Sequence, residues 1–114
     1  MENKIKILKV EPGKAPEVTE INNDLKSMQE MVDGYIQIVP LGDDACIVCN
    51  EEGKLIGMEA NRIVGCDVIV GPFFVAGDVG GEDLCSLSED QIAEYSEQFA
   101  EPLLGHHFEF GMSM

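Results

Sequence analysis

The most apolar run of the chain covers residues 67–78, where apolar side chains follow one another instead of alternating with polar ones. A continuous apolar run of this length predicts a strand that is buried on both faces. Gly71-Pro72 interrupts the run. Because proline has no N–H group to donate to a neighbouring strand, we expect a bulge or bend there, or a position at a sheet edge.

Five further segments have the pattern of strands. Ile5 and Ile7 alternate with lysines, and the alternation shifts by one residue at Leu8, which predicts a bulge between Ile7 and Leu8. A Pro-Gly turn then leads to a returning strand, so the N-terminal segments are expected to form a hairpin. The two strands of this hairpin cover residues 4–10 and 16–21. The other three predicted strands cover residues 35–41, 45–50 and 54–58.

Two segments have the spacing of amphipathic helices. In the first, Asn22-Asn23 supplies the capping residue, Asp24 lies in the first turn, and Gly34 ends the helix. In the second, Ser88 and Gln91 form a capping box before a helix that runs to about residue 100. The inward-facing apolar residues are Leu25, Met28, Met31 and Val32 in the first helix and Ile92, Tyr95 and Phe99 in the second.

These elements predict an α+β fold, a single domain over residues 1–114 with a mainly antiparallel sheet of about six strands and two α-helices packed on it. Residues 59–65 are expected to be irregular or briefly helical, and the tail, residues 105–114, to add a short final strand. The centre of the sheet is expected at residues 35–41, 45–50 and 68–76.

The charge is the strongest anomaly, since 22 acidic residues stand against 7 basic ones and the net charge is −15. No lysine or arginine follows Arg62. Such a field repels nucleic acids and anionic membranes and attracts basic surfaces, although an acidic surface that only keeps the protein in solution explains the same composition. The N-terminus lacks the apolar core of a signal peptide and no apolar run approaches about 20 residues, so we expect a cytoplasmic protein.

Four acidic residues of the second predicted helix recur at a spacing that places them on one face. They are Asp90, Glu94, Glu97 and Glu101. On a helix, such carboxylates stand about 5–6 Å apart and repel one another by a few tenths of a kcal/mol per pair. Because no basic residue intervenes to offset this repulsion, we interpret the stripe as a binding face for a basic partner.

The cysteines and histidines do not predict a metal site. Cys46 and Cys49 have the spacing of a zinc-ligand pair, but residues three apart in a strand point to opposite faces, and no second pair follows. We therefore expect buried, reduced thiols. His106 and His107 are adjacent and face opposite ways on an extended chain, which indicates ordinary surface residues. No metal and no cofactor are expected.

Asn61 and Arg62 precede the apolar run and allow two interpretations. The guanidinium of Arg62 can hold a carboxylate or phosphate in a fork, with a ligand pocket between Asn61, Arg62 and the bend at Gly71 and Pro72. Alternatively, Arg62 pairs with one of the many nearby acidic side chains, and the abundance of acids favours this interpretation.

A set of short motifs occurs in this order along the chain: KILKVEP at residues 6–12, GYIQIV at 34–39, NEEGKL at 50–55, Asn61-Arg62, IVGPFFVAG at 69–77 and LSEDQI at 87–92. Together they lie within residues 4–99 and resemble domain-of-unknown-function family thirty-eight forty-six. The resemblance implies a small accessory protein of a bacterium, phage or mobile element, in some cases encoded near antirestriction genes. It supplies no activity and no catalytic residues.

We therefore expect a non-catalytic acidic binding protein of a phage or mobile element, with an anti-defence role, that occupies a basic, nucleic-acid-binding site on a host protein by carboxylate mimicry of phosphates. The alternative is a domain that binds or sequesters a small molecule in the pocket at Asn61, Arg62, Gly71 and Pro72. An enzyme is not expected, because no nucleophile–base pair, metal motif or phosphate loop occurs. Direct binding to nucleic acid or membranes is not expected either, and the sequence leaves homo-oligomer formation open.

Overall fold

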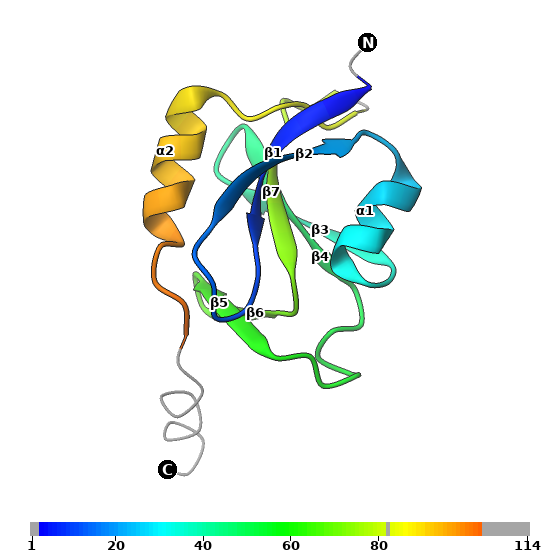
Figure 1. Cartoon of the computed structure of the whole chain (residues 1–114), viewed down its shortest axis with the longest axis vertical. Helices are drawn as coiled ribbons and strands as arrows, with labels where there is room; N and C mark the ends of the chain where they lie inside the picture. Colours follow the sequence, from blue (N-terminus) through cyan, green and yellow to red (C-terminus); the bar gives the residue numbers. More distant parts are fainter. Residues whose placement is uncertain (1–2, 82, 104–114) are drawn as a thin grey trace.

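In the computed structural model, which describes residues 3–81 and 83–103, two helices enclose an antiparallel sheet. Five strands form the main sheet in the order β2-β1-β7-β4-β3, and β5 and β6 form a separate two-stranded sheet (Figure 1). The predicted α+β class, with mainly antiparallel strands and two helices, is confirmed. The elements are β1 (Lys4–Val10), β2 (Glu17–Asn22), α1 (Leu25–Val32), β3 (Ile36–Leu41), β4 (Ala45–Asn50), β5 (Ala60–Val64), β6 (Asp67–Val70), β7 (Phe73–Gly77) and α2 (Glu89–Gln98).

Each face of the main sheet packs into its own apolar layer, and the two helices lie on opposite sides of it (Figure 1). The layer under α1 consists of Ile5, Ile7, Ile21, Met28, Val32, Cys46, Val48, Phe74 and Ala76. The layer under α2 and β6 consists of Leu8, Val10, Leu41, Ala45, Ile47, Cys49, Ile69, Phe73, Val75, Leu87, Tyr95 and Phe99. Since both faces are covered, the inner strands β4 and β7 are buried at every position.

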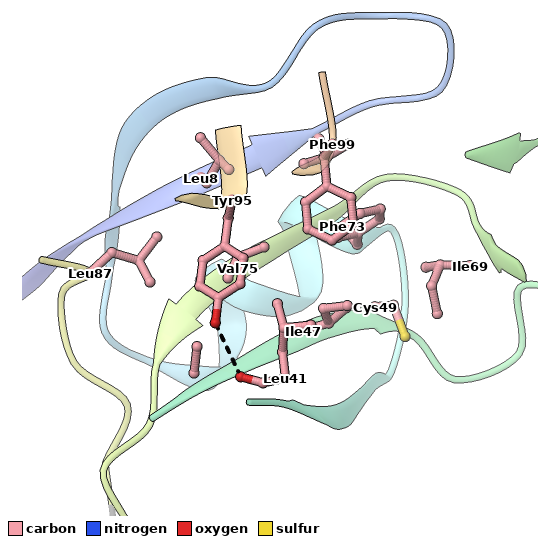
Figure 2. Close-up of a cluster of buried hydrophobic side chains, with 12 residues drawn as sticks. Leu8, Leu41, Ile47, Cys49, Ile69, Phe73, Val75, Leu87, Tyr95 and Phe99 are labelled. Atoms are coloured by element: carbon pink, nitrogen blue, oxygen red, sulfur yellow. Dashed lines mark hydrogen bonds between the residues drawn. The ribbon is translucent and has the colours of Figure 1, made fainter. Parts of the chain in front are cut away.

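Two aromatic residues attach α2 to the sheet. The Phe99 ring meets the Phe73 ring edge to face, with centroids 5.5 Å apart. The Tyr95 hydroxyl donates a hydrogen bond to the Leu41 carbonyl at 3.4 Å (Figure 2). An aromatic pair of this geometry contributes about 0.5–1.5 kcal/mol beyond the area that it buries. The predicted inward positions of Tyr95 and Phe99 are therefore confirmed.

The shift of alternation at Leu8 does not mark a bulge, contrary to the prediction. β1 pairs with β2 without interruption, with Ile7 opposite Thr19 and Leu8 opposite Val18. Ile7 points into the layer under α1 and Leu8 into the layer under α2, and both are fully buried. The alternation disappears because β1 lies inside a sheet that is covered on both faces.

The apolar run at residues 67–78 is two strands rather than one. Gly71 takes a φ of +76°, and the chain leaves the small sheet after β6 to enter the main sheet as β7. The predicted bend at Gly71-Pro72 is confirmed. The prediction that the whole run lies in the sheet centre is wrong for β6, and the prediction that residues 35–41 lie there is also wrong, because β3 is an edge strand.

Two predictions for the segment between β4 and β6 are wrong as well. Residues 54–57 form turns and residue 58 is irregular, so no strand forms there, whereas residues 59–65, expected to be irregular or briefly helical, contain β5. Tertiary contacts decide both cases. Leu55 and Ile56 are exposed in the turn, whereas the polar residues of β5 are buried by partners far away in the chain.

The caps of α1 differ from the prediction by one or two residues. The N-cap is Asp24, whose carboxylate accepts a hydrogen bond from the Ser27 N–H at 2.7 Å, and not Asn22-Asn23. The helix ends at Asp33, which takes the left-handed conformation one residue before Gly34. Aspartate tolerates this conformation better than most residues, so glycine is not required to end the helix.

Candidate functional site

The helix that carries the predicted acidic stripe is fixed at its start and along its inner side. The Ser88 side chain accepts from the Gln91 N–H at 3.1 Å, and the Gln91 side chain accepts from the Ser88 N–H at 2.8 Å. The predicted capping box is therefore confirmed. With Tyr95 and Phe99 buried on the inner side, the opposite side of α2 has no packing role and is free to carry charge.

The structure brings three of the four predicted acidic residues onto α2. Asp90, Glu94 and Glu97 lie on the helix and are exposed. Glu101 is also exposed, but it lies beyond the end of α2 at Gln98, so it does not continue the helical stripe. The helix has no basic residue in its last turn. The acidic face of α2 is hereafter Asp90, Glu94 and Glu97.

The seven basic residues lie on other elements, and three of them form ion pairs with nearby acids. The ion pairs among the described residues are Lys9–Glu11 at 2.8 Å, Lys14–Glu11 at 3.4 Å and Lys54–Asp67 at 2.6 Å. The hydrogen bond from Lys9 lowers the pKa of Glu11, and the one from Lys54 lowers the pKa of Asp67. These bases therefore neutralise acids near β1 and β6, while α2 carries none.

Arg62 is an interior residue, only 3% exposed, and each of its three side-chain nitrogen atoms donates to a neutral oxygen atom. Its Nε donates to the Phe99 carbonyl at 3.0 Å. Its Nη1 donates to the Asn61 carbonyl and Oδ1 at 3.0 and 2.8 Å, and its Nη2 donates to the Lys14 carbonyl. Burial lowers the pKa of Arg62. The predicted pairing of Arg62 with a carboxylate is wrong, because carbonyl oxygens take that place.

Asn61 completes this interior junction. Its Nδ2 donates to the Val10 carbonyl at 2.9 Å and to the Gly71 carbonyl at 2.8 Å, while its Oδ1 accepts from Arg62. The junction of Asn61 and Arg62 thus ties β5 to the end of β1, the bend before β7, the β1–β2 turn and the end of α2. Both side chains use their polar atoms to hold the fold.

The predicted pocket is therefore not open at this junction. Asn61, Arg62 and Gly71 do come together, as predicted, but they are buried. Pro72 lines a surface depression of about 330 Å³. That depression is also lined by Lys9, Glu11, Pro12, Glu30, Met31 and Asp33. The sequence carries no local signal for this structural role, because the partners of Asn61 and Arg62 lie far away in the chain.

Two hollows that the sequence did not indicate lie on either side of β3. The β6 hollow, about 170 Å³, is lined by Gln37, Val39, Cys49, Asn50, Glu51, Lys54, Leu55, Asp67, Val68, Ile69 and Val70. The α1 hollow, about 290 Å³, is lined by Asn23, Asp24, Leu25, Met28, Ile38, Asp83 and Leu84. Both are at or below the roughly 300–1,000 Å³ that is usual for small-molecule sites.

The two cysteines of β4 are buried in different layers, as predicted, with Cys46 under α1 and Cys49 under α2. Burial raises the pKa of the Cys46 thiol to about 12 and also raises that of Cys49. In the described ranges, no group of histidine, cysteine and acidic side chains could hold a metal ion. His106, His107 and the tail, residues 105–114, lie outside the described residues.

Comparison with known proteins supplies a family but no activity. A family model described as Domain of unknown function (DUF3846) matches residues 5–100. No curated protein and no solved structure matches the chain. The match extends from β1 to just beyond α2 and contains both the acidic face and β3. Within the part of the chain that the structure describes, no helix is long and apolar enough to cross a bilayer.

Proposed function

The chain belongs to the DUF3846 family, and we propose that it is a non-catalytic acidic binding protein. In this proposal it occupies a basic, nucleic-acid-binding site on a host protein, with its carboxylates in the place of phosphates. An origin in a phage or mobile element and a role against host defence belong to the same proposal. The sequence motifs within residues 4–99 support these two parts of the proposal.

The observation that carries the proposal is the separation of charge along the chain. All seven lysines and arginines lie at or before position 62 of the chain. The residues after Arg62 include acidic residues but no lysine or arginine. Of the basic side chains, Arg62 is buried, and Lys9, Lys14 and Lys54 form ion pairs. The negative field over α2 is therefore not offset by a base on the same helix, and a partner with a positive surface would meet it directly.

The positions of the carboxylates on α2 support a role other than helix stability. Glu89 and Asp90 lie in the first turn, where the helix dipole favours negative charge. Glu97 lies near the opposite end, where a carboxylate is unfavourable by about 0.3–1 kcal/mol. Glu94 stands one turn from both Asp90 and Glu97, so like charges repel. A helix selected for stability alone would carry a base near its end, and α2 has none.

A pull-down from host lysate with matched charge variants tests the proposal. The α2 variant carries Asp90→Asn, Glu94→Gln and Glu97→Gln. The control variant carries Glu17→Gln, Glu20→Gln and Glu30→Gln. Each removes three negative charges, so both have a net charge of −15 + 3 = −12. The six residues are all exposed, so neither set of changes disturbs the core.

The unmodified chain is expected to retain a basic protein at low salt and to release it at moderate salt, since screening weakens contacts between exposed charges. Duplex DNA is expected to compete with it. The α2 variant is expected to lose the partner and the control to keep it. Equal loss in both variants would show that only net charge matters, and retention that is independent of salt and DNA would contradict the proposal.

The alternative function, binding of a small molecule, is supported by the β6 hollow rather than by the predicted pocket. The hollow combines apolar residues with the ion pair of Lys54 and Asp67 at 2.6 Å. A thermal-shift screen against nucleotides and metabolites tests this function. Stabilisation that disappears in Lys54→Met would favour it, and the absence of any stabilising compound would count against it.

A further inference from the structure

The two edges of the main sheet differ in how they are protected. β2 carries Glu17 and Glu20 along its length, whereas β3, with the sequence IQIVPL, carries no charged residue. An edge strand exposes unpaired backbone groups that can pair with another chain, and natural proteins usually block such edges with charges, proline or bulges. On β3 the only such device is Pro40. The β3 edge is therefore open to pairing along its first half.

The pairing of β3 with β4 shows which backbone groups point outward. The Tyr35 carbonyl accepts from the Glu51 N–H at 2.8 Å, and the register then places residues 37, 39 and 41 opposite 49, 47 and 45. Bonded and non-bonded pairs alternate along an antiparallel ladder. The N–H and C=O groups of Ile36 and Ile38 therefore point away from β4. The backbone nitrogen of Pro40 also points away from β4, which agrees with its lack of an N–H group.

Hollows lie beside this edge on both faces of the sheet. A strand added to β3 would send alternate side chains to the two faces. On one face they would meet the β6 hollow, with Val39, Val68 and Val70. On the other they would meet the α1 hollow, next to Ile38, which is 47% exposed. The open backbone and the two hollows, each partly lined by apolar residues, therefore fit the same extended occupant.

The charges around β3 select the kind of occupant. Asp33 and Glu51 lie near the start of the strand, and Asp43 and Asp44 follow its end. Asp83 lines the α1 hollow. These acids are exposed. A second copy of the chain would bring the same acids and another charge of −15 to the interface, so repulsion disfavours pairing of two β3 edges. A segment with an apolar centre and basic ends fits the surface.

We propose that β3 binds an extended segment of a basic partner protein, which joins the main sheet as an added strand. Alternate apolar side chains of the segment occupy the β6 and α1 hollows, and its lysines or arginines lie against the acids at the two ends of β3. The inference rests on the proposed function and names the part of the chain that receives the basic partner. The acidic face of α2 then meets the positive surface of the same partner.

A labelled synthetic peptide with a short central run of valines between terminal lysines and arginines is the probe, because consecutive valines reach the hollows on both faces, and fluorescence anisotropy measures its binding. Ile38→Pro removes an outward N–H from the β3 edge. Val18→Pro is the matched control on the β2 edge, because Val18 is also 47% exposed. The Asn23 N–H bonds to the Asn3 carbonyl, so by alternation the Val18 N–H also points outward. Ile38→Pro is expected to weaken binding about tenfold, as the loss of one backbone hydrogen bond does, and Val18→Pro to leave it unchanged.

Hydrogen exchange of the unmodified chain gives a second measurement that does not depend on how the proline variants fold. The amides of Ile36 and Ile38 are expected to gain protection when the peptide binds. No binding of the peptide, or binding without this protection, would overturn the edge inference. Binding that protects these amides but does not weaken with salt would overturn the proposed function and keep the edge. Binding that weakens with salt but is unchanged in Ile38→Pro would overturn the edge inference and keep the proposed function.

Discussion

Replacing Arg62 by methionine tests whether the junction of Asn61 and Arg62 holds the two sheets together. Methionine is long, flexible and apolar, so it fills much of the same space but donates no hydrogen bond. The change removes the donors of four acceptors: the carbonyls of Phe99, Lys14 and Asn61, and the Asn61 Oδ1. It thereby releases β5 from the end of α2 and from the β1–β2 turn.

The expected loss of stability follows from these bonds. A buried acceptor without a partner costs about 1–3 kcal/mol. The bond to the Lys14 carbonyl is only partly buried, so water can replace it. The variant also no longer buries a charge, which recovers part of the cost. We therefore expect Arg62→Met to lower the free energy of unfolding by about 2–4 kcal/mol, a large share of the roughly 5–15 kcal/mol of a typical domain.

Urea unfolding followed by circular dichroism measures this loss, and Lys54→Met is the matched control. Lys54 is also a single cation, but its ion pair with Asp67 is exposed, with side-chain exposures of 61% and 65%. Its removal is expected to cost less than about 1 kcal/mol. Similar losses in the two variants would refute the reasoning, because they would show that the buried bonds of Arg62 contribute no more than a surface ion pair.

Three further predictions follow from local geometry and charge. Gly71→Ala is expected to lower the melting temperature more than Gly13→Ala, because both glycines have φ near +75° but only at Gly71 would a Cβ clash with the Met58 sulfur. Equal shifts would contradict this. Burial raises the pKa of Cys46 from 9.0 to about 12, so the contribution of the buried neutral thiol to stability is complete below pH 9 and is lost as the pH rises toward 12. In denaturant titrations, the free energy of unfolding of Cys46→Ala is therefore expected to decrease less over this window than that of the unmodified chain. The same decrease in both proteins would argue against this reasoning. Finally, moderate salt is expected to raise the melting temperature by screening the net charge of −15, and a flat or falling melting temperature would contradict self-repulsion.

The features that could be predicted from the sequence depend on near neighbours in the chain. The capping box of Ser88 and Gln91 lies within four residues, and the bend at Gly71-Pro72 needs only the backbone preferences of glycine and proline. The opposite orientations of Cys46 and Cys49 follow from the period of a strand. In each case the physical cause lies inside the segment, so no knowledge of the sheet order is required.

The features that could not be predicted depend on distant partners. Asn61 and Arg62 make β5 look polar and irregular, but their donors are satisfied by carbonyls of residues 10, 14, 71 and 99. Such partners have no signature in a local pattern. The same holds for β1, where the loss of alternation at Leu8 reflects a helix or strand on each face of the sheet, and these are formed by residues far along the chain.

The wrong placement of β3 in the sheet centre has a cause that bears on function. A strand without charged residues looks the same in sequence whether it lies inside a sheet or at an edge that receives another strand, because in both cases its backbone groups are meant to be paired. Exposure separates the two cases: Ile38 of β3 is 47% exposed and Tyr35, just before β3, is 66% exposed, whereas every residue of β4 and β7 is buried. β3 therefore has the composition of a central strand and the exposure of an edge, which is the combination expected if its second neighbour belongs to a partner.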